Sequence, residues 1–130
     1  MGLPAPRVLV LEDSVLVAMA IEAALVDRGF EVVVAGSLAA AHDRLATTPV
    51  AAALLDLQLP DGNSLDFASE LAAGGCAVAI CSGVDMAPVP DGSPAVRTFL
   101  KPVSAEALAS WVASVLAAPE DEAADDAGTV

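Results

Sequence analysis

The chain has 130 residues, the length of a single domain with one hydrophobic core. Its formal net charge of -13, with only five Lys and Arg residues, argues against direct binding to nucleic acid, because phosphate contacts need clustered basic side chains. No apolar run approaches the roughly 18 residues that span a bilayer, and the first residues lack the pattern of a signal peptide. We therefore expect a cytoplasmic protein that does not bind membranes.

Short apolar runs alternate with helical segments along the chain. The expected strands are residues 7–11, 31–35, 50–56, 76–81 and 96–100. The expected helices are residues 14–28, 37–46, 64–73 and 104–118. Ser14 is a suitable N-cap for the first helix, and Gly29 a suitable terminator. This alternation predicts an α/β fold with one doubly wound, five-stranded parallel sheet.

Three segments depart from the regular alternation. Residues 84–95 contain Pro88, Pro90 and Pro94, each of which removes a backbone donor, so the fourth helix expected there should be shortened or missing. Residues 1–6 are expected to form a leader. Residues 119–130 are expected to be an acidic, disordered tail.

Polar side chains stand at the ends of four of the expected strands. They are Glu12 and Asp13 after the first, Asp56 at the end of the third, Ser82 after the fourth and Lys101 after the fifth. The carboxyl ends of parallel strands meet at one edge of the sheet, so these side chains should lie together. Three crowded carboxylates need counter-charges, which Lys101 and a Mg²⁺ ion can supply.

Such a site suits phosphoryl transfer, in which a protein mainly positions groups and neutralises the oxygens of the phosphoryl group. Asp56 would be the nucleophile, and Lys101 and the Ser82 hydroxyl would contact the phosphoryl oxygens. The expected Mg²⁺ ligands are Asp13, Asp56, the backbone carbonyl of Gln58 and, through water, Glu12.

These motifs resemble the receiver domain of response regulators in bacterial two-component systems. The matching features are Glu12-Asp13, Leu55-Asp56-Leu57 with the turn at 59–62, Ser82-Gly83 and Lys101-Pro102. The resemblance covers residues 7–118 and implies a flavodoxin-like fold and a cis bond at Lys101-Pro102. It also implies phosphorylation of Asp56 by a histidine kinase or phosphotransfer protein, slow self-catalysed hydrolysis, and signalling to a downstream protein. We expect a single-domain, stand-alone receiver and not a conventional enzyme.

The resemblance also implies a switch and a docking surface. The family couples its Ser/Thr to an aromatic residue on the fifth strand, so Ser82 and Phe99 would form the switch. The family docks its kinases through the first helix, which makes Ser14, Val15 and Ala18 the expected kinase contacts.

Apolar side chains on two helices suggest further contacts. On the first helix they surround more of the circumference than one core-facing stripe needs, so a partner should cover some of them. On the last helix, Leu108, Val112 and Val115 are expected in the core, and Trp111 could lie at a homodimer interface.

Two other functions remain open. A hydrolase with an aspartyl-phosphate intermediate commonly needs a second acid two residues after the nucleophile, and that position holds Gln58. A pseudo-receiver used only for assembly needs no phosphorylation at all.

Overall fold

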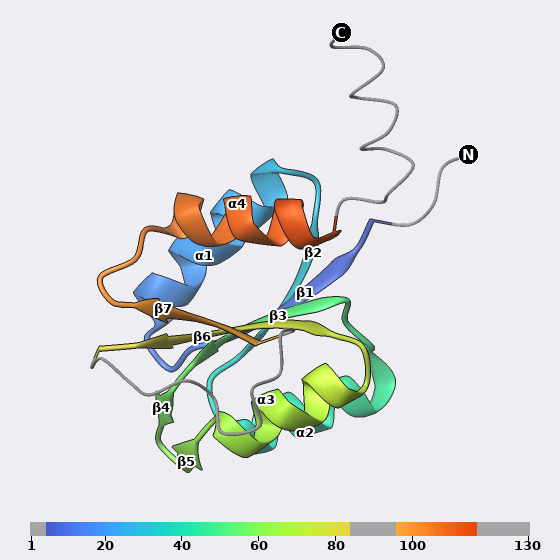
Figure 1. Ribbon diagram of the computed structural model, residues 1–130, viewed down its shortest axis with the longest axis vertical. Coiled ribbons are helices and arrows are strands. Elements are labelled where there is room, and N and C mark those ends of the chain that lie inside the picture. Colours follow the sequence, from blue (N-terminus) through green and yellow to red (C-terminus); the bar gives the residue numbers. More distant parts are fainter. Residues whose placement is uncertain (1–4, 84–95, 117–130) are drawn as a thin grey trace, which may run out of the picture.

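A parallel sheet organises the chain in the computed structural model, which describes residues 5–83 and 96–116. Its strands are β1 (Arg7–Leu11), β2 (Glu31–Ala35), β3 (Ala52–Asp56), β6 (Ala77–Ser82) and β7 (Val96–Leu100). They lie in the order β2-β1-β3-β6-β7, and every neighbouring pair is parallel (Figure 1). The order reverses between β1 and β3, which is where doubly wound sheets place their ligand sites. The predicted fold class is confirmed.

Helices cover both faces of the sheet. They are α1 (Val15–Asp27), α2 (Leu38–Thr47), α3 (Leu65–Ala73) and α4 (Ala105–Leu116). Figure 1 shows α1 and α4 on one face and α2 and α3 on the other. Along β1, Val8 and Val10 pack toward α1 and α4, while Leu9 and Leu11 pack toward α2 and α3. Burial on both faces explains why the sequence shows continuous apolar runs and no alternation.

Glycines in the left-handed conformation end α1 and α3. Gly29 follows α1 with φ 92°, and Gly75 follows α3 with φ 95°. After Gly75, the amide of Cys76 donates to the carbonyl of Leu71 at 3.0 Å and completes the helix end. Because Cys76 belongs to the helix cap, the next strand begins at Ala77, one residue later than the sequence predicted.

The expected turn after β3 is the tip of a small hairpin. Its strands are β4 (Gln58–Leu59) and β5 (Gly62–Asn63), which pair antiparallel. At the tip, both carboxylate oxygens of Asp61 accept backbone hydrogen bonds, from Leu38 at 2.9 Å and from Ala39 at 3.0 Å. A carboxylate from a distant loop therefore caps the N-terminus of α2, and it suits the positive end of the helix dipole.

Replacing Asp61 with alanine should destabilise the fold at neutral pH and have little effect in acid. The hydrogen bonds from Leu38 and Ala39 lower the pKa of Asp61 from its ordinary 3.8. The ionised carboxylate therefore stabilises the fold above pH 3.8, and this contribution is lost as the pH falls through the lowered pKa. Melting temperatures of both proteins between about pH 7 and pH 2 measure the effect.

Asp61→Asn keeps one acceptor oxygen without the charge, so its melting temperature at neutral pH should lie between those of the other two. If the melting temperatures of the natural protein and Asp61→Ala differ by the same amount down to the lowest pH, this account of the cap is contradicted.

Two expected side-chain placements are wrong. Ala18 is only 3% exposed and packs into the core between α1, α4 and the sheet, so it does not reach the outer face of α1, where a partner would bind. Val115 was expected in the core but is 41% exposed, whereas Leu108 and Val112 are buried as expected. In both helices apolar residues extend beyond the buried face, so composition alone does not indicate which ones face the sheet.

Several expectations fall elsewhere in the chain. The shortened fourth helix at 84–95, the tail at 119–130 and most of the leader at 1–6 lie outside the described residues. Among the helices of residues 5–83 and 96–116, none has both the length and the apolar character needed to cross a membrane.

Candidate functional site

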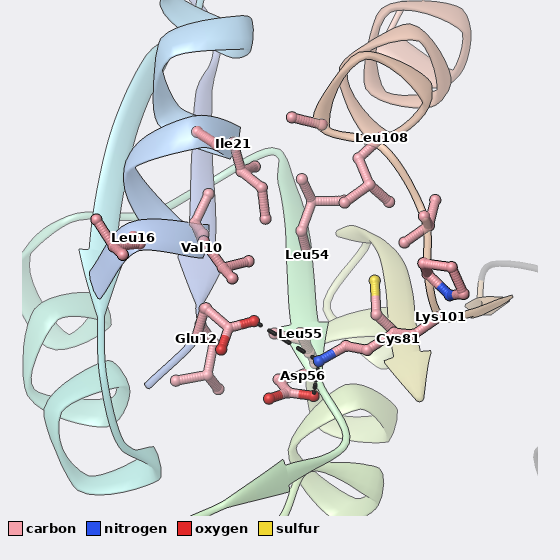
Figure 2. A pocket seen from close by; sticks show the side chains of 16 residues that line it. Val10, Glu12, Leu16, Ile21, Leu54, Leu55, Asp56, Cys81, Lys101 and Leu108 are labelled. Carbon is pink, nitrogen blue, oxygen red and sulfur yellow. Dashed lines mark ion pairs between the residues drawn. The ribbon is translucent and has the colours of Figure 1, made fainter. Parts of the chain in front are cut away.

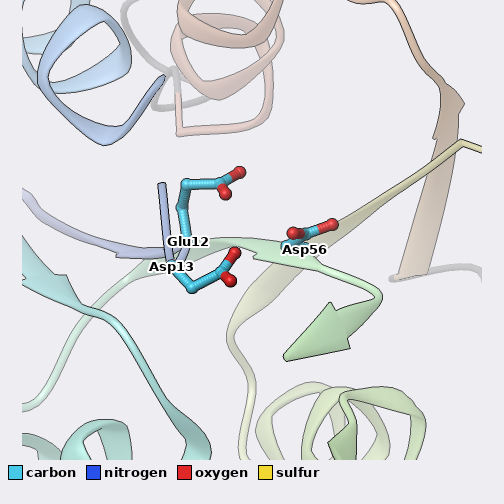
Figure 3. A group of neighbouring side chains, drawn as sticks. All are labelled: Glu12, Asp13 and Asp56. Carbon is cyan, nitrogen blue, oxygen red and sulfur yellow. The ribbon is translucent and has the colours of Figure 1, made fainter. Parts of the chain in front are cut away.

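An acid cluster, formed by Glu12, Asp13 and Asp56, lies where β1 and β3 end. The register between these strands ends with Leu11 opposite Leu55, so the next residues of both strands reach the same edge of the sheet. Each acid offers a carboxylate oxygen, and these three oxygens lie within 4.8 Å of one another (Figure 3). Asp13 is exposed, while Glu12 is buried. The sequence predicted this grouping from the strand ends alone.

Lys101 supplies the positive charge at the cluster. It follows β7, and its Nζ lies 3.0 Å from Oδ1 of Asp56 and 3.9 Å from Oε1 of Glu12 (Figure 2). Its backbone amide donates to the carbonyl of Ser82 at 2.7 Å, which fixes the start of the side chain. The peptide bond to Pro102 is cis, as the resemblance implied.

The pKa values of Glu12 and Lys101 are both raised, for different reasons. Burial raises the pKa of Glu12, although the amide of Ser14 partly opposes this by donating to its Oε2 at 3.0 Å. For Lys101, partial burial lowers the pKa, but the hydrogen bond and charge of Asp56 and the charge of Glu12 together outweigh it, so the pKa is raised. Lys101 therefore stays charged at neutral pH.

Within residues 5–83 and 96–116, one ammonium group, that of Lys101, offsets the three carboxylates of the cluster, and the shortfall of positive charge suits a divalent ion. The available ligands are oxygens only, close together, and partly open to solvent through Asp13. Hard cations such as Mg²⁺ and Ca²⁺ prefer this kind of ligand set. The residues present therefore fit a metal ion.

Ser82 and Gln58 lie at the same edge of the sheet. Ser82 is the last residue of β6 and is buried. It follows Cys81, which stands opposite Asp56 in the register between β3 and β6. Gln58 begins β4 with its side chain exposed, two residues after Asp56. Both expected site residues are therefore close in the fold to the acid cluster.

The arrangement of strands and acids is that of a known signalling family. The sequence matches the response regulator receiver domain over residues 8–113. The chain belongs to this family. Receiver domains act in two-component signalling, where they interact with kinases or phosphotransfer proteins, and they are not conventional enzymes. No curated protein matches the sequence.

Solved structures of receiver domains are similar in fold. A signal receiver domain of a response regulator from Bermanella marisrubri is 26% identical, with a TM-score of 0.73 over 87% of this chain and 99% of that one. A CheY-like receiver domain from Methanospirillum hungatei JF-1 is 18% identical, with a TM-score of 0.77 over 91% and 97%. A CheY-like receiver domain from Methylobacillus flagellatus is 22% identical, with a TM-score of 0.73 over 85% and 98%.

Phe99, the expected switch partner of Ser82 in this receiver, lies on β7. It stands opposite Cys81 in the register of β6 and β7, so the two share a face of the sheet. Ser82, the next residue, points to the other face. Phe99 instead packs edge to face against Trp111, with 6.2 Å between ring centroids, and the guanidinium of Arg97 lies 4.6 Å from its ring centre. The register therefore places Ser82 and Phe99 on opposite faces of the sheet.

A cavity of about 610 Å³ adjoins the acid cluster of the receiver. It lies between the first turns of α1 and the start of α4, with walls that include Leu16, Val17 and Leu108 (Figure 2). Its polar lining comes from Glu12, Asp56 and Lys101. An apolar recess with ionic groups at one end can accept part of a partner that reaches Asp56.

Cys81 also lines this cavity, and its thiol is a potential nucleophile near Lys101. Burial raises its pKa to about 11. The thiol therefore stays protonated at neutral pH and is a poor nucleophile.

Sequence reasoning missed one residue that touches Asp56. Ser64 donates a hydrogen bond from its hydroxyl to the backbone carbonyl of Asp56 at 2.8 Å. A serine between a turn and a helix usually indicates an N-cap, so the sequence pattern pointed to the helix and not to Asp56.

Proposed function

We propose that residues 7–118 form the phosphoacceptor of a two-component phosphorelay, in which Asp56 takes a phosphoryl group from a histidine kinase or a phosphotransfer protein. The main support is the position of the Asp56 carboxylate, which lies within the acid cluster and 3.0 Å from Nζ of Lys101. A nucleophile, a metal-binding oxygen set and a fixed cation are the groups that phosphoryl transfer needs.

In this mechanism an Asp56 oxygen attacks the phosphorus of a phosphohistidine. The new P–O bond forms as the P–N bond breaks, and the electron pair of that bond leaves with the imidazole. Lys101 stabilises the negative charge on the phosphoryl oxygens, and the Ser82 hydroxyl donates to one of them. Mg²⁺, held by Asp13, Asp56, the Gln58 carbonyl and, through water, Glu12, would neutralise further charge on these oxygens.

Phosphorylation would act as a binding switch. It replaces the single negative charge of the Asp56 carboxylate with a phosphoryl group that carries about -1.5 to -2 charges, in a site that already holds two more carboxylates. Movement of Ser82 toward the new charge would bias the chain that follows β6 and change which downstream protein binds. Slow hydrolysis by water would return the receiver to its resting state.

We propose that kinase docking uses the first turn of α1, where Ser14 is exposed, Val15 is 70% exposed and Leu16 is 80% exposed. Exposed apolar side chains in contiguous positions mark interaction sites. Replacing Val15 with aspartate should slow transfer from a cognate histidine kinase by about tenfold or more, the effect of losing one buried apolar contact at an interface. Transfer from a small phosphodonor should not change.

Val26→Asp is the matched control, because Val26 is also exposed but lies at the other end of α1. Equal rates from the kinase for the Val15 and Val26 variants would rule out this docking surface.

The experiment that tests the proposed function is incubation with acetyl phosphate and Mg²⁺, followed by intact mass and the lifetime of the adduct. A long-lived adduct that is absent in Asp56→Asn supports the receiver function. Rapid turnover of the donor would support an aspartyl-phosphate hydrolase, which the amide at Gln58 disfavours. No adduct would support an assembly module.

A further inference from the structure

Ser64 stands at the N-terminus of α3 but does not cap the helix. The serines before the other three helices, Ser14, Ser37 and Ser104, each accept a hydrogen bond from the amide three residues further on. The Ser64 side chain makes no such cap bond within the described part of the chain. Its hydroxyl instead donates to the carbonyl oxygen of Asp56 at 2.8 Å, and the residue is fully buried.

Asn63 frees the Ser64 hydroxyl for this contact. Its Oδ1 accepts from the amide of Leu65 at 3.1 Å, so one of the first free amides of α3 already has an acceptor. The direction of the Ser64 hydrogen bond is therefore compatible with a stable helix end.

Two further hydrogen bonds fix the same piece of backbone. The amide of Ser64 donates to the carbonyl of Leu57 at 3.0 Å, and the amide of Leu57 donates to the carbonyl of Cys81 at 2.9 Å. The register between β1 and β3 ends at Leu55, so the carbonyl of Asp56 lies beyond that ladder, where Ser64 supplies a donor. The two peptide groups that follow the Asp56 Cα are thus held by α3 and β6.

We propose that Ser64 is a positioning residue for phosphoryl transfer to Asp56. By holding the Asp56 carbonyl, it sets the direction of the Asp56 side chain toward the acid cluster and Lys101. The same peptide groups lead to Gln58, whose carbonyl is one of the proposed metal ligands. This inference rests on the proposed function of Asp56. Reactions of this kind lose up to about 100-fold in rate when a reacting group moves by about 1 Å.

The test compares Ser64→Ala with Ser37→Ala at a temperature where both are folded. Ser37→Ala is the matched control, because it removes a helix cap and so costs stability, but the Ser37 hydroxyl contacts the amide of Ala40 and not Asp56. The readout is the rate of adduct formation at Asp56 with acetyl phosphate at saturating Mg²⁺.

We expect Ser64→Ala to lower the maximal rate by about 10- to 100-fold, with an unchanged half-saturating donor concentration, because Ser64 does not touch the donor. Ser37→Ala should stay within about twofold of the natural protein, because the Ser37 hydroxyl bonds to its own helix and not to Asp56. A purely structural role would lower the melting temperature of Ser64→Ala and leave its maximal rate unchanged.

Ser64→Cys covers the case in which the alanine variant does not fold. A thiol fills nearly the same space but donates weakly, so this variant should also be slow. If either Ser64 variant folds and forms the adduct as fast as the natural protein does, the positioning role is overturned. If the natural protein itself forms no adduct, the proposed function of Asp56 fails and this inference falls with it.

Discussion

Replacing Lys101 with methionine should slow phosphoryl transfer to Asp56 by about 100- to 1000-fold, the effect of removing one preorganised group that stabilises transition-state charge. Its Nζ lies 3.0 Å from the nucleophile, and the charges of Asp56 and Glu12 keep it protonated. Methionine keeps a long apolar side chain but removes the ammonium group. The rate of adduct formation with acetyl phosphate and Mg²⁺ measures the loss.

Arg97→Met is the control for Lys101→Met. It removes the same charge from β7, four residues before Lys101, but Arg97 lies over the ring of Phe99 and not at the acid cluster. Its rate should match that of the natural protein. A Lys101→Met rate within about tenfold of the natural one would mean that the ammonium group adds little to the reaction.

Replacing Asp13 with asparagine should have opposite effects on stability and on metal binding. Without metal, removal of one of three crowded carboxylates relieves repulsion; because Asp13 is exposed, we expect a gain of at most about 1 kcal/mol and a rise of a few degrees in melting temperature. The affinity for Mg²⁺ should fall by about 10- to 100-fold or more, because the loss of even an outer-shell partner costs that much.

Melting temperatures over a Mg²⁺ titration measure both effects of Asp13→Asn, because a ligand that binds only the folded state raises the transition in proportion to RT ln(1 + [L]/Kd). Asp43→Asn removes an exposed carboxylate of α2 that does not belong to the acid cluster, and serves as the control. An Asp13→Asn protein that melts lower without metal, or that binds Mg²⁺ as tightly as the natural protein, would contradict this account of the site.

The order of strands and helices was predictable because two local signals delimit them. Apolar runs indicate buried strands, and glycines such as Gly29 and Gly75 mark helix ends with a left-handed conformation that other residues rarely adopt. In a parallel sheet, the order of the strands then brings Glu12, Asp13, Asp56 and Lys101 to one edge without any knowledge of side-chain packing.

The face on which a side chain lies was harder to predict. Phe99 was assigned to the switch from its place in the motif, but a shift of one residue moves a strand side chain to the opposite face. The observed register puts Thr98 on the same face as Ser82, and Phe99 on the other. Similarly, Ala18 sits on a helix with apolar residues around most of its circumference, where no pattern identifies the buried side.

Hydrogen bonds between distant residues could not be read from the chain at all. Asp61 caps α2 from 22 and 23 residues away, and Ser64 turns its hydroxyl from its own helix toward Asp56. Both residues carry ordinary turn or cap signatures in the sequence, and only the tertiary fold determines which backbone group each one meets.

The most direct test of the account is chemical identification of the phosphorylated residue. The protein would be treated with acetyl phosphate and Mg²⁺, reduced with borohydride, which converts an aspartyl phosphate into homoserine, and digested for peptide mass analysis. We predict homoserine at position 56 alone. Homoserine at position 13, or a reduced residue in no peptide while the donor is consumed, would contradict the assignment of Asp56 as the phosphoacceptor.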